Sequence, residues 1–100
     1  MAPKEDSIPE LNRVIHERIR LGIMSILSAH EAKTFTELKE LLKTTDGNLS
    51  VHGRILEDSG YIKSEKAFVD RKPLTVFYIT AKGKKAFMDY LVKLKEIIRQ

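Results

Sequence analysis

TTDGNLSVHGRILEDSGY, residues 44–61, has the features of one helix with recognisable ends. Thr44 and Thr45 are suitable N-cap residues, because a threonine hydroxyl can accept a hydrogen bond from an unpaired N–H of the first turn. Asp46 then places a carboxylate near the positive end of the helix. Gly60 favours the left-handed conformation in which many helices end. We therefore predict a helix over about residues 45–59.

The two sides of this predicted helix differ in composition. At about 3.6 residues per turn, one side carries Leu49, His52, Gly53 and Leu56. The other side carries Gly47, Ser50, Val51 and Arg54. Small, polar or β-branched residues followed by an arginine suit a helix that approaches another surface closely. The DNA major groove admits a helix and presents base-edge acceptors that arginine can bind with two N–H groups. The alternative is an ordinary amphipathic helix with a solvated outer side.

The charge of the chain is concentrated in one segment. The net charge is +4, and residues 61–85 contain seven Lys or Arg against two Asp or Glu, which gives that segment +5. A local basic patch suggests a polyanionic partner, although an ordinary lysine-rich surface is the alternative.

There is no cysteine, so the sequence offers neither a disulfide framework nor a thiolate metal site. No apolar run approaches the ~20 residues that span a bilayer. The first residues lack the apolar region of a signal peptide, which predicts a cytoplasmic protein without membrane contact.

Helical periodicity predicts further helices around the central one. Residues 1–8 are expected to be a flexible tail, and residues 9–100 a single domain. Apolar residues recur at helical spacing from Pro9 to about Ala29 or His30, which predicts a first helix. Lys33 to Phe35 predict a very short strand or an extended entry to the second helix. That helix is expected to run to Lys43. Its N-terminus is capped either by Thr34 together with Glu37 or by Thr36. A tight turn then leads into the central helix, as in a helix-turn-helix.

After Gly60 the pattern changes to that of strands. Residues 61–69 and 74–79 are rich in β-branched and aromatic residues, and residues 70–73 predict the turn between them. Thr80 caps a last helix that begins at Ala81. A two-stranded hairpin is marginal alone, so we expect Tyr61 and Phe77 to anchor it on the helices. The predicted fold is mainly helical with a small antiparallel hairpin, a winged helix-turn-helix with a three-helix core.

The chain resembles the small prokaryotic winged helix-turn-helix transcriptional regulators of the MarR and ArsR type. The matching segments are FTELKELL (35–42), TDGNLSVHGRILEDSGYI (45–62) and DRKPLTVFYITAKGKKA (70–86). The resemblance implies a homodimer that binds operator DNA, with the third helix in the major groove and the wing along the minor groove or backbone. One departure is Gly53, where such regulators generally carry leucine. A glycine within a helix costs about 1 kcal/mol relative to alanine, which leaves the pose of the helix open.

The residues expected to contact double-stranded DNA come from the central helix and the wing. In the helix region they are Thr44, Thr45, Gly47, Asn48, Ser50, Val51 and Arg54. In the wing they are Lys63, Lys66, Arg71, Lys72 and Thr75. Arg54 is the main candidate for reading a base, and a salt bridge with Asp58 one turn later is its alternative. For Asn48, Ser50 and Val51 the alternative is simple exposure to solvent. For Thr44 and Thr45 it is helix capping, and for Arg71 and Lys72 it is a solvated turn. His52 is expected to form hydrogen bonds at the edge of the core.

Apolar residues at both ends of the chain predict a homodimer. They are Leu11, Val14, Ile15, Phe87, Tyr90, Leu91, Leu94, Ile97 and Ile98. The alternative is that these two stripes pack on each other within one chain.

No nucleophile–base pair, ligand cluster or glycine-rich phosphate loop is apparent, so the sequence predicts no enzyme activity, metal or cofactor. The leading hypothesis is a DNA-binding regulator, and the alternative is a winged helix that binds another protein.

Overall fold

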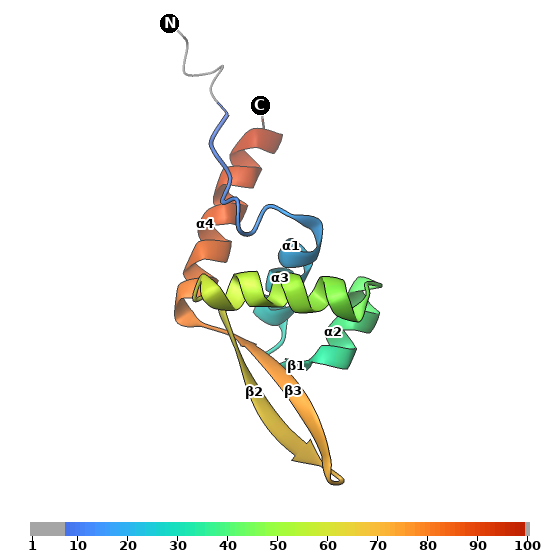
Figure 1. The fold of residues 1–100 in the computed structure, drawn as a ribbon. Coiled ribbons are helices and arrows are strands. Elements are labelled where there is room, and N and C mark those ends of the chain that lie inside the picture. The colour runs from blue at the N-terminus through green and yellow to red at the C-terminus, as the bar shows by residue number, and fades with distance from the viewer. Residues whose placement is uncertain (1–7, 100) are drawn as a thin grey trace, which may run out of the picture.

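The computed structural model describes residues 8–99 and confirms the predicted order of elements. The elements are α1 (Arg18–Ala29), β1 (Lys33–Thr34), α2 (Phe35–Leu42), α3 (Asp46–Asp58), β2 (Ile62–Val69), β3 (Lys72–Ile79) and α4 (Ala81–Ile98). The short strand β1 joins the hairpin, so the strands form an antiparallel sheet in the order β1-β3-β2. The predicted tail lies outside the described residues apart from Ile8. In Figure 1 the hairpin and α4 project from opposite ends of the helical core.

The first helix begins later than predicted. Residues 9–17 are not helical, and α1 starts at Arg18. The Asn12 side chain accepts hydrogen bonds from the backbone N–H groups of Val14 and Ile15, at 2.9 and 3.2 Å, which holds a local turn instead. Glu17 has extended backbone and caps α1 by accepting from the N–H of Arg20 at 2.8 Å. Side-chain capping therefore overrides the apolar periodicity that extended back to Pro9.

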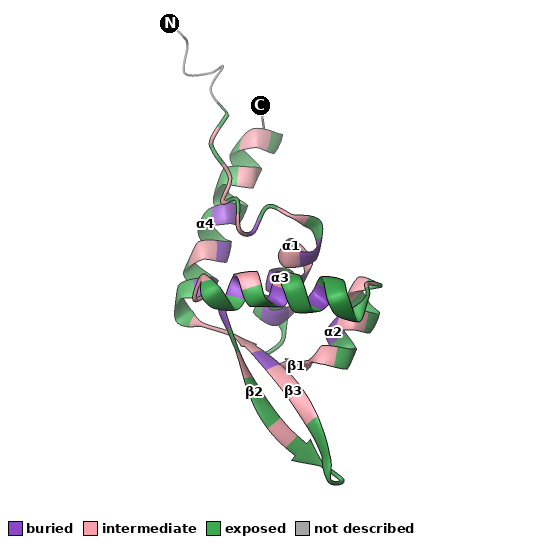
Figure 2. Cartoon of the chain, viewed as in Figure 1, coloured by how far each residue is buried: buried purple, intermediate pink, exposed green. Residues whose placement is uncertain are grey.

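The core lies between the three-helix unit, the base of the hairpin and the first half of α4. Figure 2 shows this distribution, with buried segments near the centre and exposed segments at the hairpin tip. The buried hydrophobic residues are Ile15, Ile19, Ile23, Met24, Leu27, Leu38, Leu49, Leu56, Ile62, Phe77, Phe87 and Tyr90. The predicted anchor Phe77 is therefore confirmed. Tyr61 is partly buried, and its hydroxyl accepts a hydrogen bond from Asn12 Nδ2 at 2.8 Å.

The ends of α2 and α3 are fixed by the caps that the sequence predicts. Thr34 and Glu37 form the reciprocal capping box at the start of α2, so the alternative start at Thr36 is wrong. The Thr45 hydroxyl caps α3 by accepting from Asn48 N–H at 3.1 Å. Gly60 follows α3 with φ of 80°, and its N–H donates to the carbonyl of Glu57. This left-handed residue lets the chain leave the helix directly into the hairpin.

The turn of the hairpin is shorter than predicted. It contains only Asp70 and Arg71, because Lys72 and Pro73 already belong to β3. Both turn residues have positive φ, 51° and 67°, as a type I′ turn requires. This turn matches the right-handed twist of the two strands, so the pairing continues to Val69 opposite Lys72. Pro73 is tolerated because β3 has a neighbour on only one side at that position.

The junction of hairpin and α4 holds the two projecting parts at fixed positions. The Thr80 hydroxyl caps α4 by accepting from Gly83 N–H at 2.9 Å, and it donates to the carbonyl of Gly60 at 2.6 Å. A Cβ at Gly83 would overlap with the backbone carbonyl of Tyr61, so glycine is needed for this close approach. Among the described residues, no helix combines the length and apolar character needed to cross a membrane.

Candidate nucleic-acid interface

Helix α3 lies across the core with the predicted polar side outward. Its inner side buries Leu49, Gly53 and Leu56. The outer residues Gly47, Asn48, Ser50, Val51 and Arg54 are exposed, as is the cap residue Thr45, while Thr44 is half-buried. Val51 leaves 58% of its surface exposed without a core contact to explain its presence. This side of the helix is available for contact with a large partner.

Gly53 lies on the buried side of α3 and faces the Phe77 ring at the base of the hairpin. It is buried, and a Cβ at this position would lie 3.8 Å from Phe77 Cε1, which is an ordinary van der Waals contact. The Phe77 ring therefore occupies the space that a larger inward side chain would fill. The helix continues from Asp46 to Asp58 through this position. Gly53 thus does not divide α3, which is one continuous helix.

The turn between α2 and α3 places the start of α3 at the surface. Lys43 adopts the left-handed conformation with φ of 50°, which reverses the chain between the two helices. Lys39 of α2 forms an ion pair with Asp46, with 2.9 Å between Nζ and Oδ1. The negative charge of Asp46 is thus partly compensated by a cation from α2. Repulsion between this carboxylate and a polyanion at the helix start is correspondingly reduced.

An open groove of about 240 Å³ separates α3 from the hairpin. Ser50 and Arg54 line it from α3, and Lys66 and Thr75 line it from the hairpin. Lys66 Nζ donates to the Thr75 hydroxyl at 2.8 Å, so these two side chains are held together on the groove side of the ribbon. Within residues 8–99, Arg54 takes part in none of the ion pairs, so the alternative of a salt bridge with Asp58 is not seen. Its guanidinium keeps its donors for an external acceptor.

The structure does not bring all the predicted wing residues together. The register pairs Lys66 with Thr75 on one side of the ribbon, and it pairs Lys63 with Tyr78 and Val69 with Lys72 on the other. Lys63 Nζ lies 5.5 Å from the centre of the Tyr78 ring, which stabilises it there by a cation–π contact. The prediction therefore combined residues from two faces, although alternation along β2 already separates Lys63 from Lys66. Arg71 lies in the turn at the tip.

A hydrogen-bond network behind α3, which the sequence does not reveal, connects it to α1. Arg20 Nη1 lies 2.8 Å from His52 Nδ1. Because a guanidinium can only donate, the histidine nitrogen is the acceptor. The predicted role of His52 as a hydrogen-bonding residue at the edge of the core is confirmed. Arg20 also donates to the backbone carbonyl of Val14, so one side chain fixes α3 and the segment before α1.

The apolar stripes at the two ends of the chain are partly used within one chain. Ile15, Phe87 and Tyr90 are buried in its core, so their assignment to a dimer interface is corrected to a core role. Leu11, Val14 and Leu94 pack partly against that core. Leu91 and Ile98 remain exposed, at 39% and 72%, and Ile97 is half-buried. The sequence reasoning missed two further exposed residues of α4, Met88 and Val92, which are 57% and 55% exposed.

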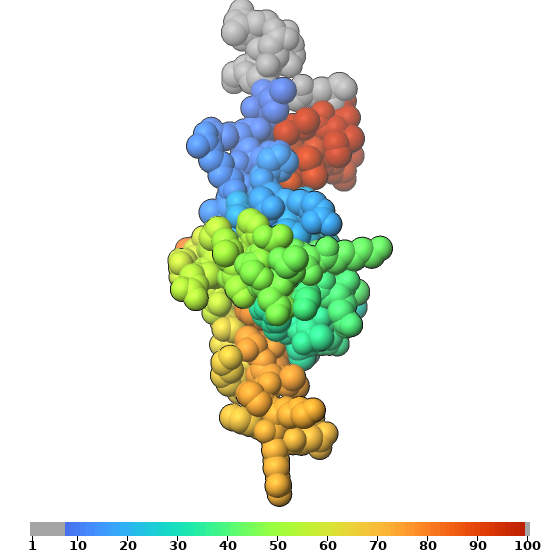
Figure 3. Space-filling model, turned by 45° about the vertical axis from the view of Figure 1, so that its right-hand side comes forward, coloured from blue at the N-terminus to red at the C-terminus, as the bar shows by residue number. Residues whose placement is uncertain are grey.

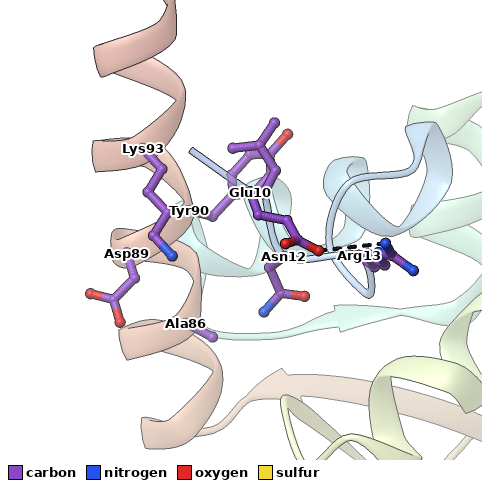
Figure 4. Close-up of a pocket in the computed structure, with 8 residues that line it drawn as sticks. Glu10, Asn12, Arg13, Ala86, Asp89, Tyr90 and Lys93 are labelled. Atoms are coloured by element: carbon purple, nitrogen blue, oxygen red, sulfur yellow. Dashed lines mark ion pairs between the residues drawn. The ribbon is translucent and has the colours of Figure 1, made fainter. Parts of the chain in front are cut away.

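A polar hollow of about 360 Å³ lies between the segment before α1 and α4. Figure 4 shows its lining, with Glu10 and Arg13 on one wall and Asp89 and Lys93 on the other. Glu10 and Arg13 form an exposed ion pair of 3.5 Å. Tyr90 forms the inner wall, and its hydroxyl lies 2.8 Å from His16 Nδ1. Burial raises the pKa of the Tyr90 phenol.

The arrangement of helices α1 to α3, the antiparallel hairpin and the exposed side of α3 defines a winged helix-turn-helix protein. The winged helix DNA-binding domain family matches residues 19–98 of the sequence. The chain belongs to this family. The predicted fold class and the resemblance to winged-helix regulators are thereby confirmed.

Individual proteins are also similar to this chain in sequence or structure. The chain is 32% identical over 85 residues to an uncharacterised protein of Methanocaldococcus jannaschii, covering 85% of this chain and 92% of that protein. A solved structure of a transcriptional regulator homologue from Pyrococcus horikoshii OT3 is 35% identical, with a TM-score of 0.83 and coverage of 88% of this chain and 87% of the other. A MarR family regulator from Silicibacter pomeroyi has the same fold at 18% identity, with a TM-score of 0.67 and coverage of 83% and 55%.

Proposed function

We propose that the chain is a transcription regulator that binds specific sites in duplex DNA through α3 and the wing, the hairpin formed by β2 and β3. The observation that carries this proposal is the exposed side of α3, where Arg54 has no ion-pair partner within residues 8–99. An α-helix fits the major groove, where arginine binds guanine with two hydrogen bonds. Membership of the winged helix DNA-binding domain family supports the same function.

The residues of α3 divide into positioning and reading roles. Asn48 and Ser50 lie near the start of the helix, where short polar side chains can bind phosphate oxygens or base edges. Gly47 has open space around its Cα, which permits close approach of a backbone. Thr44 and Thr45 add hydroxyl groups near the helix start, and Val51 presents methyl groups suited to a thymine methyl. Arg54 is the base-reading residue in this arrangement.

The turn of the wing supports a binding role through its strained conformation. Asp70 and Arg71 both have positive φ, where glycine or asparagine is usually found in a two-residue hairpin turn. A long side chain in the left-handed region costs about 1–2 kcal/mol, which a purely structural turn would avoid by using glycine. We infer that Arg71 serves to place a positive charge at the tip. Arginine inserted into a narrow minor groove responds to its width and negative potential.

We further propose that α4 forms a homodimer with a second copy of the chain. Exposed apolar side chains occur along the part of α4 that projects from the core; they are Met88, Leu91, Val92 and Ile98. Figure 3 shows this part of α4 at the opposite end of the molecule from the wing. A two-fold dimer would present two copies of α3 to half-sites about 34 Å apart along the duplex. Leu11 and Val14 contribute at the edge of this surface.

The proposed mechanism requires binding alone. A dimer bound over a promoter prevents access of other proteins, which makes the chain a repressor, and its place of action is the cytoplasm. No catalytic group, metal ion or cofactor takes part. Among residues 8–99, no three histidine, aspartate or glutamate side chains are grouped so that they could hold a metal ion.

Salt-dependent binding tests the DNA-binding proposal against the alternative of a protein-interaction domain. Fluorescence anisotropy with labelled duplexes selected from a random pool measures the dissociation constant between 50 and 200 mM salt. If a dimer contacts 6–10 phosphates, its affinity should fall by about 10³–10⁵ over this range. Absence of duplex binding at low salt would contradict the proposal and favour a protein partner.

Sedimentation tests the dimer separately. Combined Leu91→Glu and Val92→Glu substitutions, at two exposed positions of α4, should convert the dimer to monomers, because two carboxylates would be buried in an apolar contact. Lys93→Glu is the matched control, since it adds a carboxylate at an exposed position on another side of α4 without removing an apolar side chain. A dimer that survives the double substitution would place the interface elsewhere.

A further inference from the structure

Phe68 is an exposed aromatic side chain in a position that the fold does not explain. It leaves 73% of its surface exposed, and among residues 8–99 it is the one aromatic residue with a largely exposed apolar side chain. It lies opposite Pro73, in the second residue pair from the Asp70–Arg71 turn. It takes no part in the core, which ends at Phe77 in β3. An aromatic ring at the end of a projecting ribbon contributes little to folding.

The surroundings of Phe68 are basic and belong to the side of the ribbon that borders α3. Strand residues alternate between the two sides, so Phe68 shares a side with Lys66, its neighbour two positions earlier. Lys66 and its partner Thr75 line the groove with Ser50 and Arg54. Figure 3 shows that the hairpin extends well beyond the body of the molecule as a narrow projection. A duplex held by α3 would therefore have this side of the ribbon next to it.

Charge complementarity identifies duplex DNA as the occupant. Lys66 lies on the same side of the ribbon as the ring, and Arg71 lies in the turn beyond it; these two cations suit the phosphate backbone beside a groove. The minor groove is about 6 Å wide, and the axes of two paired strands already lie about 4.8 Å apart before their side chains are counted. A single side chain therefore enters this groove more readily than the whole ribbon. Phenylalanine is among the apolar residues that minor-groove proteins insert between base pairs, which partly unstacks them and bends the duplex.

We propose that Phe68 acts as an apolar wedge in the minor groove and bends the bound DNA. This inference rests on the proposed DNA-binding function. It also predicts where sequence preference arises outside the contacts of α3. Pyrimidine–purine steps such as TA and CA unstack easily, so one should occur at a fixed distance from each half-site, under the wing.

Bending and mismatch preference test the wedge on a duplex selected by the intact protein. Resonance energy transfer between dyes at the duplex ends measures the bend, and anisotropy measures affinity. Phe68→Ala should reduce the bend and weaken binding by about tenfold, because the energy of contact with the unstacked step is lost. A single mismatch placed under the wing should increase the affinity of the wild-type protein, since that step is already unstacked. Phe68→Ala should lose this preference.

Matched variants separate a wedge from a general effect of the hydrophobic wing. Val69→Ala removes a neighbouring side chain that is 53% exposed on the other side of the ribbon, and it should leave the bend unchanged. Phe68→Leu should retain much of the bend, because leucine also acts as a wedge. Equal behaviour of Phe68→Ala and Val69→Ala would overturn the inference, as would a change of oligomeric state in Phe68→Ala. If the intact protein binds no duplex, the proposed function itself fails.

Discussion

Replacement of Arg54 by alanine tests the reading role of α3 with little effect on the fold. The Arg54 side chain is exposed and takes part in none of the ion pairs or side-chain hydrogen bonds found between residues 8 and 99. Alanine is also the most favourable residue in a helix interior. We therefore expect the free energy of unfolding to change by less than about 0.5 kcal/mol, as for other surface substitutions. A loss of binding can then be attributed to the contact itself.

The expected loss follows from the number of bases that Arg54 reads. A bidentate arginine–guanine contact contributes about 1–3 kcal/mol to discrimination against the wrong base. A homodimer on two half-sites makes this contact twice, so the substitution should cost about 2–6 kcal/mol on the selected duplex. At 1.4 kcal/mol per factor of ten, the affinity should fall by about 30-fold or more. On a random duplex the loss should be much smaller, because no base contact is present to remove.

Anisotropy titrations at one salt concentration provide the measurement, with the selected duplex and a scrambled duplex of equal length. Lys93→Ala is the matched control, since it removes one exposed positive charge from α4, away from the groove. It should weaken neither titration appreciably. The same fold-loss for Arg54→Ala on both duplexes would refute base reading and leave only a phosphate contact.

Three further predictions concern the wing, the helix packing and a cap. Arg71→Gly should raise the free energy of unfolding by about 1 kcal/mol, because the strained φ is relieved, and it should weaken binding to all duplexes. A thermal melt measures the first effect and a DNA titration the second. Unchanged binding would show that the tip of the hairpin is not part of the interface. Gly53→Ala should raise the melting temperature by about 2–8 °C, since its Cβ meets Phe77 Cε1 at an ordinary 3.8 Å; a lower melting temperature would show that the fit is tighter than the structure indicates. Hydrogen bonds from the backbone and side chain of Thr34 lower the pKa of Glu37, so its charge stabilises the folded state above the ordinary glutamate pKa. That contribution is lost as pH falls through the lowered pKa, so Glu37→Gln should destabilise the protein at neutral pH, and the difference from wild type should vanish in acid; a pH-independent difference would contradict the charge effect.

The sequence predicts the features that depend on local interactions. The caps at Thr34, Thr45 and Thr80, and the exit at Gly60, are each set by residues a few positions away, and the structure places all of them as expected. The inner and outer sides of α3 also follow from its own periodicity. For these reasons the order of elements and the exposed side of α3 could be predicted without coordinates.

Features that depend on distant contacts could not be predicted in the same way. The segment before α1 has helical periodicity, but Asn12 holds a turn there while its side chain also donates to Tyr61. Ile15 and Tyr90 look like interface residues in the sequence, yet they pack into one core. In each case the deciding partner is far away in the sequence.

Cross-linking at a single cysteine tests the central claim most directly, since the natural chain contains no cysteine. Ser50→Cys places a thiol on the exposed side of α3, and Ser28→Cys places one on the exposed end of α1 as the control. The selected duplex carries a disulfide-activated tether on one base of the half-site. If α3 occupies the major groove, the protein with Cys at position 50 should form a disulfide with the duplex rapidly, while the control should not. Equal cross-linking of the two variants, or none at position 50, would contradict the account.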